Sequence, residues 1–120
     1  MRHLRAAGQP VPAPLTLRAL IDTGASQTAV DLQSIQTLGL PRRGTKTLYV
    51  ASLAATPQTF DEYEVSLTFP HSQAALTLFT LPVVATALMI QGFEVLLGRD
   101  VLQNCLLVYD GQTNTYTLAF

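Results

Sequence analysis

The sequence predicts a mainly β fold with one or two short helices, and three observations lead to this expectation. The chain has 120 residues, 48% of them hydrophobic, which suffices for one domain whose core needs no disulfide or metal. Short apolar runs alternate with polar residues in many places, as half-buried strands do. Turn-forming glycines and prolines separate these runs. We therefore expect a single domain that is rich in short strands.

The N-terminal end is expected to differ from the rest of the chain. Residues 1–14 contain Gly8 and three prolines, so we expect an extended arm there and a domain over residues 15–120. Asp31 is expected to cap a short helix that ends at Gly39. The apolar face of this helix consists of Leu32, Ile35 and Leu38.

Eight segments are expected to form strands, and two pairs of them to form hairpins. The first hairpin turns across residues 54–57 and the last one near Asp110 and Gly111. The longest uncharged stretch, residues 72–91, is expected to hold buried strands rather than a membrane span, because Pro82 and several threonines interrupt it. The expected strands are residues 15–21, 28–30, 45–53, 59–69, 76–84, 94–97, 106–110 and 114–120, with one or two helical turns over residues 99–104.

The charge of the chain limits its partners. Seven basic and eight acidic residues give a net charge of −1, so the chain lacks the basic patch that nucleic-acid binding needs. Only 12% of the residues are charged, about half the usual share of roughly a quarter. A lone protomer would therefore have an undercharged surface, and we expect a partner to cover part of it.

The few cysteine and histidine residues also argue against disulfide bonds and a metal site. The single Cys105 excludes a disulfide framework and is expected to be a small core residue. Neither His3 nor His71 has partners for a metal site. No targeting segment is visible at the N-terminus, so we expect a cytoplasmic protein.

Two short motifs contain the candidate catalytic residues of the chain. The first, residues 20–25, places Asp22 directly after two apolar strand residues and before Thr23 and Gly24. A carboxylate at such a place is costly to hold unless it is paired or used, although Asp followed two residues later by Gly is also common in ordinary β-turns. The second motif, residues 95–100, again puts an apolar run against a glycine, followed by Arg-Asp.

Together, with a hairpin between them, the two motifs resemble the retropepsin-like (retroviral-type) aspartic protease family, and the long C-terminal ending looks like its cellular and bacterial branch. The resemblance implies a single-lobe acid-protease β-barrel that is closed by homodimerisation. It also implies an aspartic endopeptidase that uses no cofactor and no metal. Its dyad would consist of one Asp22 from each protomer, because the chain has only one Asp-Thr-Gly sequence.

The resemblance assigns roles to the residues that follow Asp22. Thr23, Gly24 and Ala25 would support the active site, with the Thr23 hydroxyl holding the two loops together across the two-fold axis. Gly24 would let the loops approach each other without a side chain between them. Ser26 would continue the motif toward the substrate.

One position departs from the family pattern. The arginine at the place of Arg99 commonly pairs with an acidic residue shortly after the Asp-Thr-Gly-Ala sequence, and this chain has Ser26 there. Asp100, Asp31 or a backbone carbonyl is left as the partner of Arg99.

The hairpin over residues 49–63 occupies the place of the flap that closes over substrate. Its tip contains no glycine, so a stiffer flap is expected, and a plain surface hairpin is the alternative. Apolar residues around Leu20, Val30, Leu53 and Leu97 favour apolar preferences at the cut site. The substrate contacts expected in the flap and pocket are Ser26, Ser52, Leu53, Ala54 and Leu97.

Two functions therefore fit the sequence. The first is a homodimeric aspartic endopeptidase that acts on peptides or proteins. The alternative is a catalytically weak or inactive retropepsin-like module for dimerisation or peptide binding, favoured by the glycine-free flap and by Ser26. Aromatic residues of the C-terminal hairpin are expected either on the dimer surface or in the protomer core. They are Tyr109, Tyr116 and Phe120.

Overall fold

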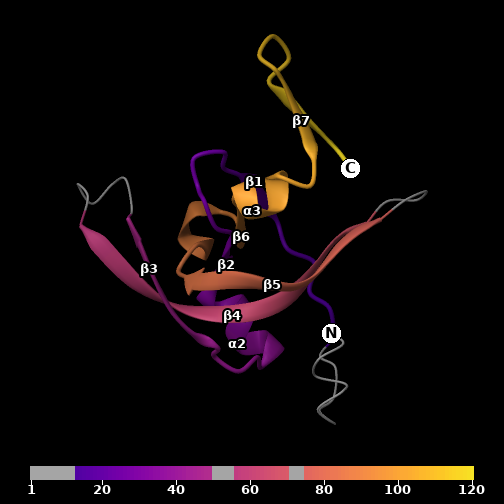
Figure 1. Ribbon diagram of the computed structural model, residues 1–120. Coiled ribbons are helices and arrows are strands. Elements are labelled where there is room, and N and C mark those ends of the chain that lie inside the picture. The colour runs from indigo at the N-terminus through magenta and orange to yellow at the C-terminus, as the bar shows by residue number, and fades with distance from the viewer. Residues whose placement is uncertain (1–12, 50–55, 71–74) are drawn as a thin grey trace.

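The computed structural model describes residues 13–49, 56–70 and 75–120, and strands dominate these ranges (Figure 1). The strands are β1 (Ala19–Ile21), β2 (Ala29–Asp31), β3 (Gly44–Tyr49), β4 (Pro57–Phe69), β5 (Leu76–Thr86), β6 (Val95–Leu97), β7 (Leu106–Asp110) and β8 (Thr115–Ala119). The helices are α2 (Leu32–Leu38), α3 (Arg99–Leu102) and the 3₁₀ helix η2 (Met89–Gln91). The predicted fold class, a mainly β single lobe with two short α-helices, is confirmed.

Six strands form one sheet in the order β1-β6-β2-β5-β4-β3, and β7 and β8 form a separate pair. The expected strand over residues 15–21 is shorter than predicted, because only Ala19–Ile21 pair with a neighbour, β6. From residue 75 on, the uncharged stretch forms β5 and η2. Among the described residues, no helix has the length and apolar character needed to cross a membrane. Residues 1–12 of the expected arm and 50–55 of the expected flap lie outside the described residues.

Strands β1, β6 and β2 define the part of the sheet that carries the first motif. β1 runs parallel to β6, with Ile21 opposite Leu97, whereas β2 runs antiparallel to β6, with Ala29 opposite Leu96. The chain between β1 and β2 must therefore cross over the end of β6 that lies between them. This crossing brings residues 22–28 against the second motif.

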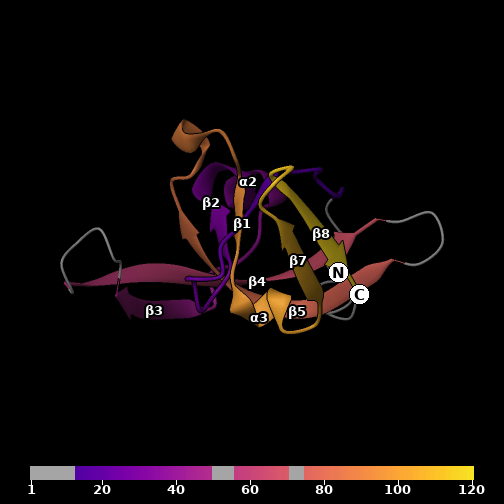
Figure 2. The same ribbon diagram turned by 90° about the horizontal axis from the view of Figure 1, so that it is seen from above.

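Strands β4 and β5 form a long antiparallel ribbon that curls across the molecule (Figures 1 and 2). Their register shifts between Val65 and Leu67, and opposite this shift Thr80 has a positive φ of 51°. A bulge of this kind bends a strand and increases its twist. The curl follows from it and gives the sheet the shape of a half-barrel.

Helix α2 forms as the sequence predicts at both of its ends. Its N-cap Asp31 accepts a hydrogen bond from the amide of Gln33, and its C-cap Gly39 takes the left-handed conformation with a φ of 68°. Ile35 is buried, but Leu32 is 40% exposed. The prediction of an inward-facing Leu32 is wrong, because the first residue of the helix lies on its outer side.

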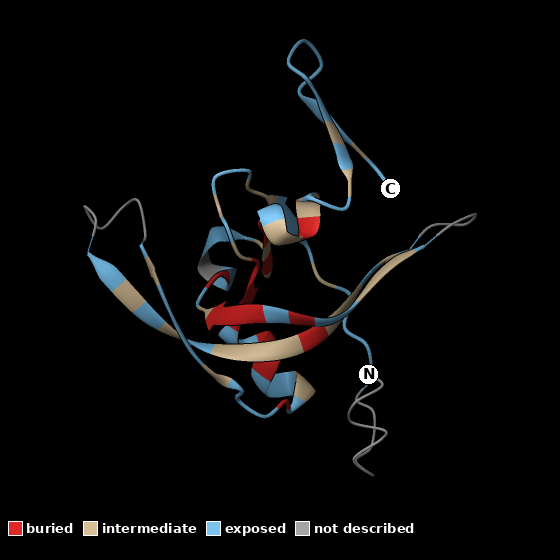
Figure 3. Cartoon of the chain, viewed as in Figure 1, coloured by how far each residue is buried: buried red, intermediate tan, exposed pale blue. Residues whose placement is uncertain are grey.

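The core lies where β2, β5 and β6 meet the two helices (Figure 3). Val83 on β5 and Val101 on α3 are fully buried, and Ile35 is 1% exposed. Val101 thereby fixes α3 beneath the turn that follows β6. The buried cluster consists of Val30, Ile35, Leu40, Val65, Leu81, Val83, Ala85, Val95, Leu97 and Val101.

The β7–β8 hairpin projects from the rest of the molecule (Figure 1). Tyr109, Tyr116 and Phe120 are 55%, 57% and 46% exposed. The alternative that these aromatics fill the protomer core is therefore wrong. Cys105 at the base of the hairpin is only partly buried, so the expectation of a core cysteine is wrong as well, although burial still raises the pKa of its thiol.

Candidate active site

The loop over residues 22–28 is held against the end of β6 by its own backbone. The amide of Asp22 donates to the carbonyl oxygen of Leu97 at 3.0 Å, which continues the pairing of β1 with β6. The amide of Arg99 donates to the carbonyl oxygen of Ala25 at 2.8 Å. These two bonds fix the loop on both sides of the point where it crosses β6.

Within the loop, Asp22 organises a tight turn. Its Oδ1 accepts a hydrogen bond from the amide of Gly24 at 2.9 Å, and its carbonyl oxygen accepts one from the amide of Ala25 at 3.2 Å. A Cβ at position 24 would lie 3.2 Å from Asp22 Oδ1, closer than ordinary contact. Gly24 thus lets the carboxylate lie directly against the backbone of its own turn, with the side chain partly exposed.

At Gly98 the backbone of the crossing loop lies directly against the residue that follows β6. A Cβ at this residue would lie 2.7 Å from the carbonyl carbon of Gln27 and 3.0 Å from the carbonyl oxygen of Ala25. The backbone of Gly98 is extended, with a φ of −91°, so glycine is needed here for space and not for its conformational freedom. The glycine of the second motif is therefore what allows the first motif to cross over it.

Thr28 and Asp100 form a clamp beneath the loop that the sequence did not reveal. The fully buried Thr28 donates its hydroxyl to Asp100 Oδ1 at 2.7 Å and its amide to Oδ2 at 3.0 Å. The same hydroxyl accepts from the amide of Gly98 at 3.1 Å. Asp100 also accepts from the amide of Val101 in the first turn of α3. One carboxylate thereby joins the end of the loop to the start of the helix.

The partner of Arg99 is a backbone carbonyl, one of the three candidates left open by the sequence. Its Nη1 donates to the carbonyl oxygen of Thr23 at 2.9 Å. Asp100 and Asp31 are engaged with backbone amides and with Thr28 instead. The missing acidic residue at Ser26 is thus replaced by a direct bond from the guanidinium to the loop backbone.

A second carboxylate, Asp31, positions a neighbouring turn. It is 3% exposed, and its Oδ1 accepts from the amides of Leu88 and Met89 at 2.8 and 3.0 Å. These bonds, above all the one from Leu88, hold the pKa of Asp31 below its ordinary value of 3.8. The sequence indicates Asp31 as a helix cap. Its hydrogen bonds to the amides of Leu88 and Met89 could not be predicted, because these residues lie far along the chain.

Gln27 links the loop to the long ribbon. Its Nε2 donates to Glu62 Oε2 on β4 at 2.8 Å. Nothing in the local sequence marks this glutamine, because its partner lies 35 residues later. The bond fixes the side of the loop that faces β4.

The other residues predicted to belong to the site divide between the surface and the core. Thr23, Gly24 and Ser26 are exposed, and Ala25 is partly buried. Leu97 and Val30 are 2% and 4% exposed and belong to the core cluster, so their burial favours a supporting role over contact with a substrate. Leu20 is 46% exposed. The predicted flap contacts Ser52, Leu53 and Ala54 lie outside the described residues.

The structure thus places a partly exposed aspartate in an Asp-Thr-Gly turn, and the loop that contains this turn crosses over the Gly-Arg-Asp segment on a single curled lobe. The model of the gag-polyprotein putative aspartyl protease family matches residues 14–104, and the chain belongs to this family. No curated protein matched the chain. The matched residues include the whole loop over residues 22–28 and α3, and they end just before the β7–β8 hairpin.

Proposed function

We propose that the protein is a homodimeric aspartic endopeptidase whose catalytic dyad takes one Asp22 from each protomer. The observation that carries the proposal is Asp22 itself, a partly exposed carboxylate in a turn fixed by Gly24, Leu97 and Arg99. The chain has one Asp-Thr-Gly sequence, whereas this hydrolysis uses two carboxylates. A two-fold axis through the exposed loop supplies the second.

The proposed reaction needs only the two carboxyl groups and a water molecule. The ionised Asp22 takes a proton from the water, whose oxygen attacks the carbonyl carbon of the peptide. The protonated Asp22 of the second copy gives its proton to the carbonyl oxygen, which leaves a tetrahedral diol. When the diol collapses, one of its hydroxyl protons passes to the ionised Asp22 of the second copy, the C–N bond breaks, and the amine leaves with the proton held by the first Asp22, which restores the dyad.

The surroundings of Asp22 support the proposed roles of the two carboxyl groups. Thr23 is exposed beside Asp22, where its hydroxyl is available to the loop of the second copy. Hydrogen bonds to backbone atoms join the loop over residues 22–28 to the end of β6 and to α3. The position of the Asp22 carboxylate therefore does not depend on bound substrate, and such preorganisation favours efficient catalysis. An extended substrate would pair with the protein through its backbone, as a strand does.

Cleavage of a mixed peptide library between about pH 4 and pH 7, the range where carboxylates exchange protons, tests the proposal. The wild type is compared with Asp22→Asn and with the control Asp61→Asn, which removes an exposed carboxylate paired with Arg42 at 3.4 Å. We expect cuts by the wild type and by Asp61→Asn, and none by Asp22→Asn. Cleavage by Asp22→Asn at the wild-type rate contradicts the proposal. A folded, dimeric wild type that cuts nothing favours the binding module instead.

A further inference from the structure

Arg99 carries a charge that no acidic side chain of its own protomer neutralises. The ion pairs among the described residues are formed by other arginines, which bind carboxylates on β4. The exposed guanidinium of Arg99 makes one hydrogen bond, from Nη1 to the carbonyl oxygen of Thr23 at 2.9 Å. A guanidinium has further N–H donors, which are arranged in a planar fork. Most of the hydrogen-bonding capacity of Arg99 is therefore unused within the protomer.

The acidic side chains of the protomer are all engaged elsewhere. The eight of them lie within the described residues, so their partners are known. Asp22, Asp31, Glu94, Asp100 and Asp110 accept hydrogen bonds from backbone amides, Glu62 accepts one from Gln27, and Asp61 and Glu64 pair with Arg42 and Arg43. The protomer thus keeps no carboxylate in reserve for Arg99.

The guanidinium is held beside the turn of Asp22. The amide of Arg99 donates to the carbonyl oxygen of Ala25 at 2.8 Å, and its Nη1 donates to that of Thr23, the residue that follows Asp22. Both the backbone and the side chain of Arg99 are thus attached to the same loop. Because this long side chain is already ordered, a ligand that binds it does not bear the full entropic cost of ordering it.

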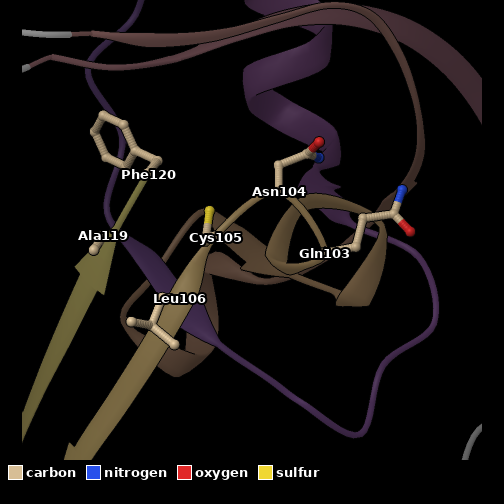
Figure 4. A pocket seen from close by; sticks show the side chains of 6 residues that line it. All are labelled: Gln103, Asn104, Cys105, Leu106, Ala119 and Phe120. Carbon is tan, nitrogen blue, oxygen red and sulfur yellow. The ribbon is translucent and has the colours of Figure 1, made fainter.

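The C-terminal end of α3 adds no further charge. An open hollow of about 480 Å³ lies there (Figure 4). It is lined by Gln103, Asn104, Cys105, Leu106, Ala119 and Phe120, and none of these side chains is charged. The hollow therefore offers neither a carboxylate to Arg99 nor a competing cation to a ligand of Arg99.

We propose that Arg99 determines specificity by binding an acidic side chain of a peptide substrate, glutamate or aspartate, beside the loop of Asp22. The inference rests on the proposed function and deepens it, because it names the class of peptide that the site takes. A carboxylate matches the fork of a guanidinium, and two parallel hydrogen bonds add geometric specificity to the attraction of the charges. A substrate that covers the loop also displaces water, which strengthens the ion pair.

A second copy of the chain is a weaker candidate for this carboxylate. Its acidic side chains have the same internal partners, so an ion pair with Arg99 would first have to break or share one of these contacts. A peptide brings its own carboxylate without that cost. Ser26 adds a local reason, because this exposed and uncharged residue directly follows Ala25, the acceptor of the Arg99 amide. The loop therefore places no negative charge there to repel an anion.

The fluorescence anisotropy of labelled peptides, measured at about pH 7, tests the proposal. The protein is the Asp22→Asn variant, so that no probe is cut. The probes are apolar peptides with a single glutamate at each position in turn, and each is compared with the same peptide that has glutamine there. Glutamate is ionised at this pH, because its ordinary pKa is about 4.3. We expect glutamate at one or two neighbouring positions to tighten binding about tenfold, the effect of a charge-assisted hydrogen bond.

Three substitutions, each added to Asp22→Asn, assign this preference to a residue. Arg99→Gln removes the charge, and Ser26→Asp keeps Arg99 but places a competing carboxylate on the loop. We expect each of them to reduce the preference for glutamate to less than about twofold. Arg18→Gln is the matched control, because it removes the same charge from an exposed arginine that precedes β1, and it should leave the preference at about tenfold. A preference that persists in folded Arg99→Gln overturns the proposal, as does a protein that binds neither peptide of any pair.

Circular dichroism shows whether each variant is folded. If neither Arg99→Gln nor Ser26→Asp folds, the salt dependence of the preference decides the question. An ion pair weakens as the salt concentration rises from about 0.05 M to about 0.5 M, so a preference for glutamate that salt does not change overturns the proposal. Sedimentation equilibrium covers the other partner. A dimer that Arg99→Gln weakens, without any preference for glutamate, assigns Arg99 to the second copy and overturns the proposal as well.

The outcomes separate this proposal from the catalytic one. A preference for glutamate that depends on Arg99, together with a wild type that cuts no peptide, sustains the binding role and contradicts the protease. A wild type that cuts peptides with and without glutamate equally well sustains the protease and overturns the role of Arg99.

Discussion

Replacing Gly98 by alanine adds one methyl group at the point where the loop over residues 22–28 crosses the end of β6. The new Cβ would lie 2.7 Å from the carbonyl carbon of Gln27 and 2.8 Å from its oxygen. To reach an ordinary contact of 3.4 Å, the loop backbone must retreat by about 0.7 Å. The obstructing atoms belong to the main chain, so no side-chain rotation relieves the clash.

The magnitude follows from two opposing terms. Overpacking a tight contact typically costs about 1–3 kcal/mol. Replacement of a glycine whose backbone suits other residues recovers about 0.4–1 kcal/mol by restricting the unfolded chain. The retreat also stretches the bond from the amide of Gly98 to Thr28 Oγ1, which is 3.1 Å long. We therefore expect Gly98→Ala to lose about 2 kcal/mol of unfolding free energy.

Gly44→Ala is the matched control for this experiment. No atom lies within 4 Å of the position that a Cβ would occupy at Gly44 on β3. We expect this variant to be as stable as the wild type or more stable by about 0.5 kcal/mol. Urea denaturation followed by circular dichroism measures both variants at one protein concentration. If Gly98→Ala is as stable as Gly44→Ala, the crossing of the loop over Gly98 is refuted as the reason for this glycine.

Three further variants test the hydrogen bonds of Thr28 and Asp31. Thr28→Val leaves the buried amide of Gly98 without its acceptor and should cost about 1–3 kcal/mol in urea denaturation, whereas Thr28→Ser keeps the hydroxyl and should cost less; equal losses contradict the clamp. Asp31→Asn keeps one oxygen for three amide donors, those of Gln33, Leu88 and Met89, and should cost about 1–3 kcal/mol at pH 7. Because the pKa of folded Asp31 is lowered from 3.8, its stabilisation is present above that pH and is lost as the pH falls through the lowered pKa. A stability difference between wild type and Asp31→Asn that does not shrink below pH 3.8 contradicts this role.

The two motifs could be recognised from the sequence because each consists of residues that are adjacent in it, and the structure brings the two motifs together. Their glycines had to be there for physical reasons that the structure supplies, a close carboxylate at Gly24 and a crossing backbone at Gly98. The caps of α2 were predictable for the same reason, since Asp31 and Gly39 act on residues within one helical turn. Strand positions followed from alternation, with errors mainly at the strand ends.

The remaining parts of the site depend on contacts between distant residues. Thr28 meets Asp100 across 72 positions, and although Asp100 belongs to the second motif, nothing in the sequence near Thr28 marks this threonine as its partner. The acceptor of Arg99 is a main-chain carbonyl oxygen, and every residue type has one, so the sequence does not indicate which residue accepts the bond. The sequence leaves open whether the C-terminal aromatics are exposed in the protomer, because an apolar run predicts burial but does not show which chain provides the contacts.

Subunit mixing tests the central claim, that each active site takes one Asp22 from each of two copies. Wild type and Asp22→Asn are mixed in equal amounts, allowed to exchange subunits, and assayed for peptide cleavage at fixed wild-type plus variant concentration. If the dyad spans two copies, mixed dimers are inactive and activity falls to about a quarter of that of the wild type alone at the same total concentration. Activity that remains at about half means that each copy cleaves with its own residues, which contradicts a shared Asp22 dyad.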